Sequence, residues 1–444
     1  MKIFIANAAL HPCNKGVEGL TKSLAQLIIQ YIPKARIVIW HTPLEKMSPR
    51  FKYICLVENN IKVIYEYSYI KFLIKIVVYA FLLFFARIYK RLRLFLKDYI
   101  CKSVHECNTS LLVPLCELLN ADLILNVNYG DVFTDYYYGF TRFFTIAAIS
   151  FLLNLVGKPI VYPPQSLGPF RTLVGRIIAQ IILKNKNIKL IMVREAYSKH
   201  YLVSLLNGSS KNVIESLDLA FLLESNESLM ELKELDFINS IADKTIIGFI
   251  IDPYRFIRND SFRLLALKIL LFLAMNKKSE NVILLIPHSE NPFIAYDGES
   301  INKLIEKVFK IHKHDNVIAI KSYPVEALKA IIKRCKLVIS FPTHPAIFAI
   351  SEGVIPIVIS YSHKAKGILQ FFGLEHLYIG YEPSCLNAEK IYNSVKKLYT
   401  QLQDENLAYL LENRLKTCIF KIKKKEKEKW FTICSWLFKL SKTK

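Results

Sequence analysis

The stretch CKLVISFPTHPAIFAISEGVIPIVISYSHK, residues Cys335–Lys364, decides the fold class of this chain. Its apolar run Lys336–Ser340 is typical of a buried parallel strand. Pro345 favours the start of a helix, which we expect over Ala346–Glu352. Ile355–Ser360 is a second apolar run and predicts the next strand. Strand, helix and strand in this order predict an α/β fold with a parallel sheet.

The same alternation continues toward the N-terminus. Strands are predicted over Lys2–Ala6, Arg36–Trp40, Ile61–Tyr65, Asp122–Asn126, Lys158–Tyr162, Lys189–Val193, Thr245–Ile251, Asn281–Pro287 and Asn316–Lys321. The polar, acidic segment Glu224–Lys244 interrupts the series and suggests an inter-domain connection. We therefore predict two doubly wound domains, residues 1–225 and 244–386, facing across a cleft, followed by C-terminal helices and a tail over 387–444.

The composition limits the kinds of binding partner and the cellular compartment that we expect for this chain. The chain has 444 residues, a net charge of +23 and 52% hydrophobic residues, which favours a globular protein with acidic partners such as phosphorylated metabolites or anionic lipids. No nucleic-acid-binding motif stands out, so we expect no nucleic acid. Nine cysteines without a CxxC pair indicate a reducing cytosol, and the start MKIFIANAAL reads as a strand rather than a signal peptide.

Two basic segments raise the question of membrane contact. Within residues 72–97, RIYKRLRLFLK (Arg87–Lys97) places apolar residues on one side, and it reads as a packed helix, an interfacial helix or, after the short apolar run before it, a transmembrane span. In the tail over 421–444, KIKKKEKEK (Lys421–Lys429) precedes several aromatic residues. This tail is either a solvated helix end or a contact with the inner face of an anionic membrane.

Three histidines follow three predicted strands of the second domain. His288 follows Asn281–Pro287, His344 follows Lys336–Ser340, and His363 follows Ile355–Ser360 with Lys364 beside it. Carboxyl ends of parallel strands meet at one edge, where ligands bind in open α/β sheets. The spacing does not match a zinc site, so we predict proton transfer and anion contact rather than metal binding.

In the first domain, Arg194 follows the strand Lys189–Val193 and can bind a carboxylate or phosphate bidentately, unless it pairs with Glu195 or Asp218. Asp131 follows the strand Asp122–Asn126, and Gln165 lies in a proline-rich segment that we expect to be a rigid ligand-facing loop. Neither a P-loop nor a GxGxxG motif is present, which argues against a P-loop NTPase and a nicotinamide or flavin cofactor.

An ordered set of motifs resembles the polysaccharide pyruvyl transferase family. The set comprises NKGVEGL (Asn14–Leu20), PQSLGPF (Pro164–Phe170), VREAYSKHYL (Val193–Leu202), DLAFLL (Asp218–Leu223), IPHS (Ile286–Ser289) and Thr343–Lys364. The resemblance implies two Rossmann-like domains of the GT-B type. It also implies transfer of a pyruvyl group from phosphoenolpyruvate, without a cofactor, to two hydroxyls of a cell-surface glycan or its precursor, forming a ketal.

Carried over by position, the resemblance assigns catalysis to His344 and His288 and substrate binding to Arg194 and Asn14. We also expect Arg194 to face His344 across the cleft. The family's arginine before the last histidine is Pro342 here, and Val17 stands where an acid is usual. Lys364, Lys366 or Arg194 then replaces that arginine, or the donor differs. A GT-B glycosyltransferase with a nucleotide-sugar donor and a non-catalytic family member remain alternatives.

Overall fold

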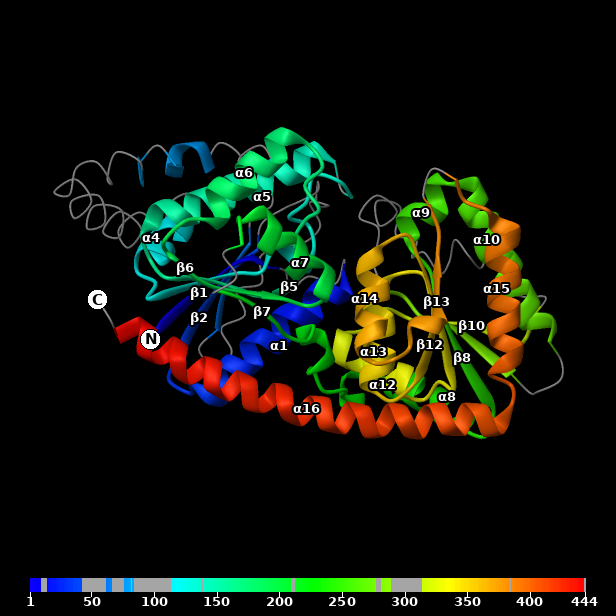
Figure 1. Cartoon of the computed structure of the whole chain (residues 1–444). Coiled ribbons are helices and arrows are strands. Elements are labelled where there is room, and N and C mark those ends of the chain that lie inside the picture. The colour runs from blue at the N-terminus through cyan, green and yellow to red at the C-terminus, as the bar shows by residue number, and fades with distance from the viewer. Residues whose placement is uncertain are drawn as a thin grey trace. The chain divides into compact units, whose positions relative to one another are not determined.

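A computed structural model describes residues 1–8, 14–41, 61–65, 76–80, 82–83, 113–137, 139–208, 212–276, 281–288, 314–382 and 385–442. The chain forms two compact units, each built on one parallel sheet (Figure 1). Unit 1 comprises Met1–Leu10, Leu24–Leu217 and Lys427–Lys444, and unit 2 comprises His11–Ser23 and Asp218–Glu426. Residues 11–23 thus group with the second sheet although they follow the first strand of the chain.

The sheet of unit 1 has seven strands in the order β3-β2-β1-β4-β5-β6-β7. Their bounds are β1 Lys2–Ala8, β2 Arg36–His41, β3 Ile61–Tyr65, β4 Leu123–Asn126, β5 Ile160–Gln165, β6 Ile188–Val193 and β7 Val213–Glu215. The connecting helices include α1 Lys15–Tyr31, α4 Val113–Leu119, η1 Asn128–Gly130, α5 Phe140–Val156, α6 Leu173–Leu183 and α7 Ala196–Leu205. This is the strand order of a Rossmann fold, whose ligand edge lies at the carboxyl ends of the strands near β1 and β4.

The sheet of unit 2 has six strands in the order β10-β9-β8-β11-β12-β13, so it repeats the same topology. Their bounds are β8 Thr245–Ile250, β9 Asn281–Leu285, β10 Val317–Ala319, β11 Leu337–Ser340, β12 Ile355–Ser360 and β13 Tyr378–Gly380. Helices of this unit include η2 Leu219–Phe221, η3 Glu227–Leu229, α8 Leu232–Ser240, α9 Pro253–Arg258, α10 Asp260–Met275, α12 Val325–Lys333, α13 Thr343–Ser351, α14 His363–Phe371 and η6 Glu375–Leu377. The α/β prediction with two doubly wound sheets is therefore confirmed.

Several local predictions need correction. The predicted loop at Pro163–Gln165 is the end of β5, and Gln165 pairs with Val193 of β6. Helix α13 begins at Thr343 rather than Ala346, which places His344 inside the first turn. The segment Glu224–Lys244 contains η3 and α8 and belongs to unit 2. Helix α5 had no counterpart in our sequence interpretation.

The chain after Leu386 is helical as predicted, with α15 over Ala388–Gln401 and α16 over Glu405–Lys442. The basic run 421–429 lies inside α16 and is not a helix end. Trp430 and Leu437 of this helix are buried, whereas Phe431 and Phe438 are exposed. The basic segment 87–97 lies outside the described residues. Within the described ranges, no helix has the length and apolarity needed to cross a bilayer.

Candidate active site

The histidine His344 lies where β11 passes into α13 at the carboxyl edge of the second sheet. Pro342 stands in an extended conformation before the helix, and its carbonyl accepts a hydrogen bond from the Ser340 hydroxyl over 2.6 Å. The turn places His344 in the first turn of α13, with 11% of its side chain exposed. Strand β11 borders β8, so this turn flanks the point where the strand order reverses.

The first turn of α1 packs directly on the imidazole of His344. A Cβ atom added to Gly16 would lie 2.3 Å from Cγ and Nδ1 of His344, so no residue with a side chain fits there without movement. The backbone amide of Lys15 donates a hydrogen bond of 3.1 Å to the carbonyl of His288. Asn14 begins the helix, because its side-chain oxygen accepts from the amides of Gly16 and Val17. Asn14, predicted to bind substrate, thus orders this turn.

The histidines His288 and His344 form a stacked pair. Their ring centroids are 6.2 Å apart and their planes differ by 22°. His288 follows β9, the neighbour of β8 on its other side, so the predicted meeting of these two histidines at one sheet edge is confirmed. Burial lowers the pKa of His288 well below its usual value, and the charges of His344 and Lys15 lower it further. His288 is therefore neutral at pH 7.

Asp218 provides the carboxylate that faces His344. Its Oδ2 lies 3.9 Å from Nε2 of His344, while its Oδ1 accepts from the amide of Ala220 and so caps η2. Only 2% of the Asp218 side chain is exposed. The two stacked imidazoles are thereby distinguished: one faces an acid and the other is held neutral.

A chain of ion pairs runs along the first two turns of α1 and on to α12. Lys15 Nζ lies 3.3 Å from Glu18, and Glu18 also pairs with Lys22 at 2.8 Å. Lys22 reaches Glu326 at 2.8 Å. Lys15 and Glu18 expose 3% and 5% of their side chains. Our sequence interpretation did not single out Lys15, Glu18 or Asp218 as site residues, although each occurs in a quoted motif.

Lys364 and His363 belong to α14, which follows β12. Lys364 is 3% exposed, and its amide donates to the Ser362 hydroxyl, which caps the helix. Strand β12 borders β11, so α14 begins at the same sheet edge as α13. The side chain of His363 lies outside the described residues, and its predicted role stays a prediction.

Arg194 follows β6 in unit 1 and is almost fully buried. Its Nε donates to the Ser166 hydroxyl over 2.8 Å, and one terminal nitrogen lies 3.7 Å from Asp131, so two predicted site residues meet here. The Glu195 carboxylate accepts from the amide and hydroxyl of Ser198 and caps α7. Arg194 and His344 belong to different units, and the expectation that they face one another stays a prediction.

Gln165 lies in a network of buried side-chain amides, and its backbone carbonyl accepts a hydrogen bond from the amide of Arg194. Its nitrogen donates to the carbonyls of Asn126 and Pro163, and its oxygen accepts from Asn128 over 2.9 Å. Asn7 donates to the side-chain oxygens of Asn126 and Asn128. The network joins the carboxyl ends of β1, β4 and β5. Gln165, which we predicted to bind substrate, is fully buried. Its hydrogen bonds in this structure connect the ends of neighbouring strands.

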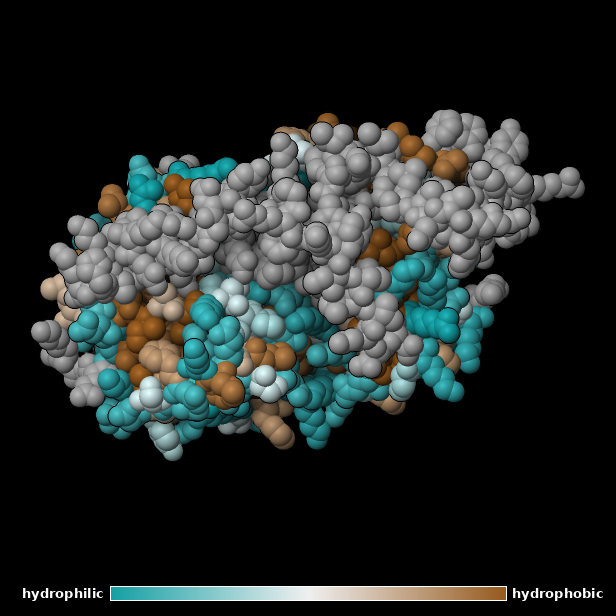
Figure 2. All heavy atoms as spheres, turned by 180° about the vertical axis from the view of Figure 1, so that it is seen from behind, coloured by the Kyte–Doolittle hydropathy of each residue, from teal (hydrophilic) through white to brown (hydrophobic). Residues whose placement is uncertain are grey.

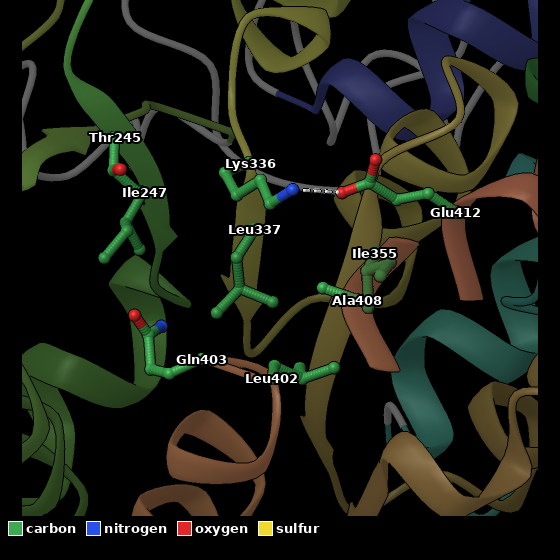
Figure 3. Close-up of a pocket in the computed structure, with 9 residues that line it drawn as sticks. All are labelled: Thr245, Ile247, Lys336, Leu337, Ile355, Leu402, Gln403, Ala408 and Glu412. Atoms are coloured by element: carbon green, nitrogen blue, oxygen red, sulfur yellow. Dashed lines mark ion pairs between the residues drawn. The ribbon is translucent and has the colours of Figure 1, made fainter. Parts of the chain in front are cut away.

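A separate pocket opens at the opposite edge of the second sheet (Figure 3). Thr245, Leu337 and Ile355, the first residues of β8, β11 and β12, line it together with the ion pair Lys336–Glu412. Ligand sites of open α/β sheets lie at the carboxyl ends of the strands, whereas this pocket lies at their amino ends.

Comparison with known proteins places this architecture in a family. The family model described as polysaccharide pyruvyl transferase matches residues 14–363, which is most of the chain. The chain belongs to the polysaccharide pyruvyl transferase family. The match begins at Asn14, just before α1, and ends at His363, the first residue of α14, so it includes His288, His344, Asp218 and Arg194. No curated protein matches the sequence.

Solved structures resemble this pyruvyl transferase family member in fold. A co-structure of S. aureus MnaA with UDP has a TM-score of 0.55 at 14% identity, covering 93% of this chain and 91% of that one. A glycosyltransferase from Rickettsia africae has a TM-score of 0.55 at 13% identity, covering 99% and 98%. UDP-GlcNAc 2-epimerase from Neisseria meningitidis bound to UDP-GlcNAc has a TM-score of 0.52 at 14% identity, covering 93% and 94%. These likenesses establish a GT-B-like fold.

The two departures from the family pattern now have structural positions. Pro342, at the position where the resemblance implies an arginine, is the N-cap residue of α13 and supplies no positive charge. Val17, where the family has an acid, is 4% exposed and packs in the core. The adjacent Glu18 supplies a carboxylate one position later on the same helical turn, paired with Lys15.

Proposed function

We propose that this protein transfers a pyruvyl group from phosphoenolpyruvate to two hydroxyls of a sugar in a cell-surface glycan or its precursor. The observation that carries the proposal is the stacked pair in which His344 faces the Asp218 carboxylate and His288 is buried with a lowered pKa. Ketal formation from an enol phosphate needs one group that gives a proton and another that takes one. Unequal imidazoles of this kind supply both roles near neutral pH.

In the proposed reaction, His344 is the general acid. It donates its proton to the methylene carbon of phosphoenolpyruvate, which becomes the methyl group of the product. A sugar hydroxyl then attacks the adjacent carbon, and the second hydroxyl attacks it as the bond to phosphate breaks. The two hydroxyl protons leave with His344 and with phosphate, so atoms and charge balance. Neutral His288 accepts a hydrogen bond from one attacking hydroxyl and passes the proton of that hydroxyl on to phosphate.

In this proposal, cationic side chains bind the phosphate and the carboxylate of phosphoenolpyruvate. Lys15 and Lys364 are both buried in unit 2, in the turns that begin α1 and α14. We propose that they take over the role of the arginine that Pro342 replaces. Arg194 in unit 1, braced by Ser166, is proposed as a further anion ligand. No cofactor takes part in this scheme. We also propose a cytoplasmic location at the inner membrane face, where a lipid-linked acceptor is accessible.

The test measures phosphate release from phosphoenolpyruvate with a panel of glycan acceptors that carry neighbouring hydroxyls. We expect His344→Gln to lower the rate by about 100-fold or more, because general acid catalysis typically contributes that much. His376→Gln is the matched control, since His376 is exposed on η6 of the same unit. Equal rates for parent and His344→Gln would refute the assignment of the acid.

Donor binding is measured separately by calorimetry. We expect Arg194→Lys to weaken phosphoenolpyruvate binding by about tenfold, because a charge-assisted guanidinium contact contributes about 1.5–3 kcal/mol. Arg36→Lys, at an exposed position at the amino end of β2, serves as control. Binding of a nucleotide sugar without binding of phosphoenolpyruvate would favour a glycosyltransferase. Binding of neither donor would favour a non-catalytic member of the family.

A further inference from the structure

Helices α5 and α6 of unit 1 carry an exposed apolar face that the proposed reaction does not use. The two helices contact each other on one side of the first sheet (Figure 1). Seven large apolar side chains on them are exposed: Phe140, Phe144 and Phe151 on α5, and Leu173, Val174, Ile177 and Ile181 on α6. We call this set the α5–α6 face. Hydrophobic residues also show along the upper edge of the view from behind, at the level of these helices (Figure 2).

Helix α6 is apolar on both of its sides. Ala179, Ile182 and Leu183 pack inward and are at most 4% exposed, whereas Leu173 and Ile181 are 73% and 59% exposed. A surface helix of a water-soluble protein normally carries polar residues on its outer side. Exposed apolar side chains that gather on two contacting helices are typical of an interaction surface. The exposed side of α6 is therefore a candidate interaction surface.

The charges around the α5–α6 face identify the kind of partner. All residues of the two helices are described, and neither helix contains Asp or Glu. The charged residues on and beside them are basic: Arg142, Arg171, Arg176 and Lys184. Asp135, the nearby acid, is buried and accepts hydrogen bonds from the amides of Arg171 and Thr172. An apolar face with a basic surround complements the surface of an anionic bilayer.

The position of the face relates it to the chemistry. Helices α5 and α6 follow β4 and β5, so their first turns lie at the carboxyl edge of the first sheet. Phe140 and Leu173 are the first residues of these helices. Thr172, which caps α6, shares its loop with Ser166, the hydrogen-bond partner of Arg194. The apolar residues thus begin beside the edge at which a sugar acceptor is expected.

We infer that the α5–α6 face docks this protein onto an anionic lipid surface, inserting the exposed side chains of α5 and α6 at the level of the head groups. This inference does not depend on the pyruvyl transfer reaction. The proposed lipid contact lies in unit 1. It is separate from segments 72–97 and 421–444, for which the sequence raised the question of membrane contact.

The experiment measures sedimentation of the full chain with vesicles of phosphatidylcholine containing about one-third phosphatidylglycerol, against pure phosphatidylcholine. We expect binding to the anionic vesicles and a loss of about tenfold or more in Ile177→Glu/Ile181→Glu, because two apolar contacts are replaced by two repelled charges. Leu264→Glu/Leu271→Glu, at exposed positions of α10 in unit 2, is the matched control and is expected to bind like the parent.

Three outcomes would overturn the inference. The first is equal vesicle binding by the α6 variant and the parent. The second is equal binding to anionic and neutral vesicles. The third is a parent chain that is dimeric by light scattering and becomes monomeric in the α6 variant, which would make the face an interface between two copies. Circular dichroism and thermal unfolding of both variants establish that the substituted chains are folded, as expected for exposed positions.

Discussion

Replacing Gly16 with alanine tests whether the first turn of α1 holds the imidazole of His344 in its working position. The added methyl group would lie 2.3 Å from the ring, about 1.2 Å short of normal carbon contact. Both sides of this contact are buried, so the ring or the turn must move. Gly16 has an ordinary helical conformation, and the change therefore tests close packing rather than backbone strain.

Two effects on stability oppose each other at Gly16. Alanine is better than glycine inside a helix by about 0.8–1.0 kcal/mol. Forcing an extra methyl group into a packed interior costs about 1–3 kcal/mol. Overpacking therefore wins, and we expect a net loss of about 0–2 kcal/mol. The effect on catalysis is larger, because a displacement of about 1 Å in a catalytic group can lower the rate about 100-fold.

The assay pairs phosphate release with urea unfolding. Gly19→Ala is the control, because Gly19 lies one turn later on the same helix and an added Cβ would have its nearest contact, Ala220, at 3.4 Å. We expect Gly19→Ala to keep full activity and to be as stable as the parent or slightly more stable. If Gly16→Ala also keeps full activity and stability, the claim that this glycine is needed for the packing of His344 is wrong.

Two further predictions concern buried ionisable groups of unit 2. Lys329 is fully buried against Glu352 at 3.3 Å and donates to the carbonyl of Ala220, so Lys329→Met should lower the free energy of unfolding by about 3–5 kcal/mol in a urea titration. The double variant Lys329→Met/Glu352→Gln should recover part of this loss. The control Lys321→Met, in an exposed ion pair, should change the free energy of unfolding by at most about 1 kcal/mol. A small effect of Lys329→Met would contradict the claim that the buried ion pair is needed for stability. His288 has a lowered pKa in the folded chain, so below pH 6.5 the unfolded chain binds more protons and stability falls as the pH falls. Unfolding at pH 7 and pH 5 should therefore show a smaller acid loss in His288→Gln than in the parent, and equal losses would mean that His288 is not held neutral.

The meeting of His288 and His344 at one edge of the second sheet was predictable, because the carboxyl ends of parallel strands lie at the same edge. His288 and His344 each follow an apolar run, and runs that alternate with helices form parallel strands whose carboxyl ends coincide. The pairing of these residues followed from local pattern and topology alone. Their different environments did not, because burial and the Asp218 carboxylate come from contacts more than 100 positions apart along the chain.

The role of the α1 turn was not predictable from its sequence. NKGVEGL contains no signal that its glycine faces His344 or that its lysine and glutamate are buried as a pair. Gln165 shows the converse case. Its proline-rich surroundings suggested a ligand-facing loop, whereas strand pairing and the amide network hold it inside the sheet edge.

By itself, the sequence determined the two parallel sheets, the family and the order in which the histidines and Arg194 occur, because hydrophobic periodicity and motif order are local properties of a chain. The tertiary structure alone decided that residues 11–23 group with the second sheet, that Gly16 packs on His344, and that one imidazole faces a carboxylate while its neighbour stays neutral. Those properties arise from burial and from contacts between distant segments, and neither is encoded in any short stretch of residues.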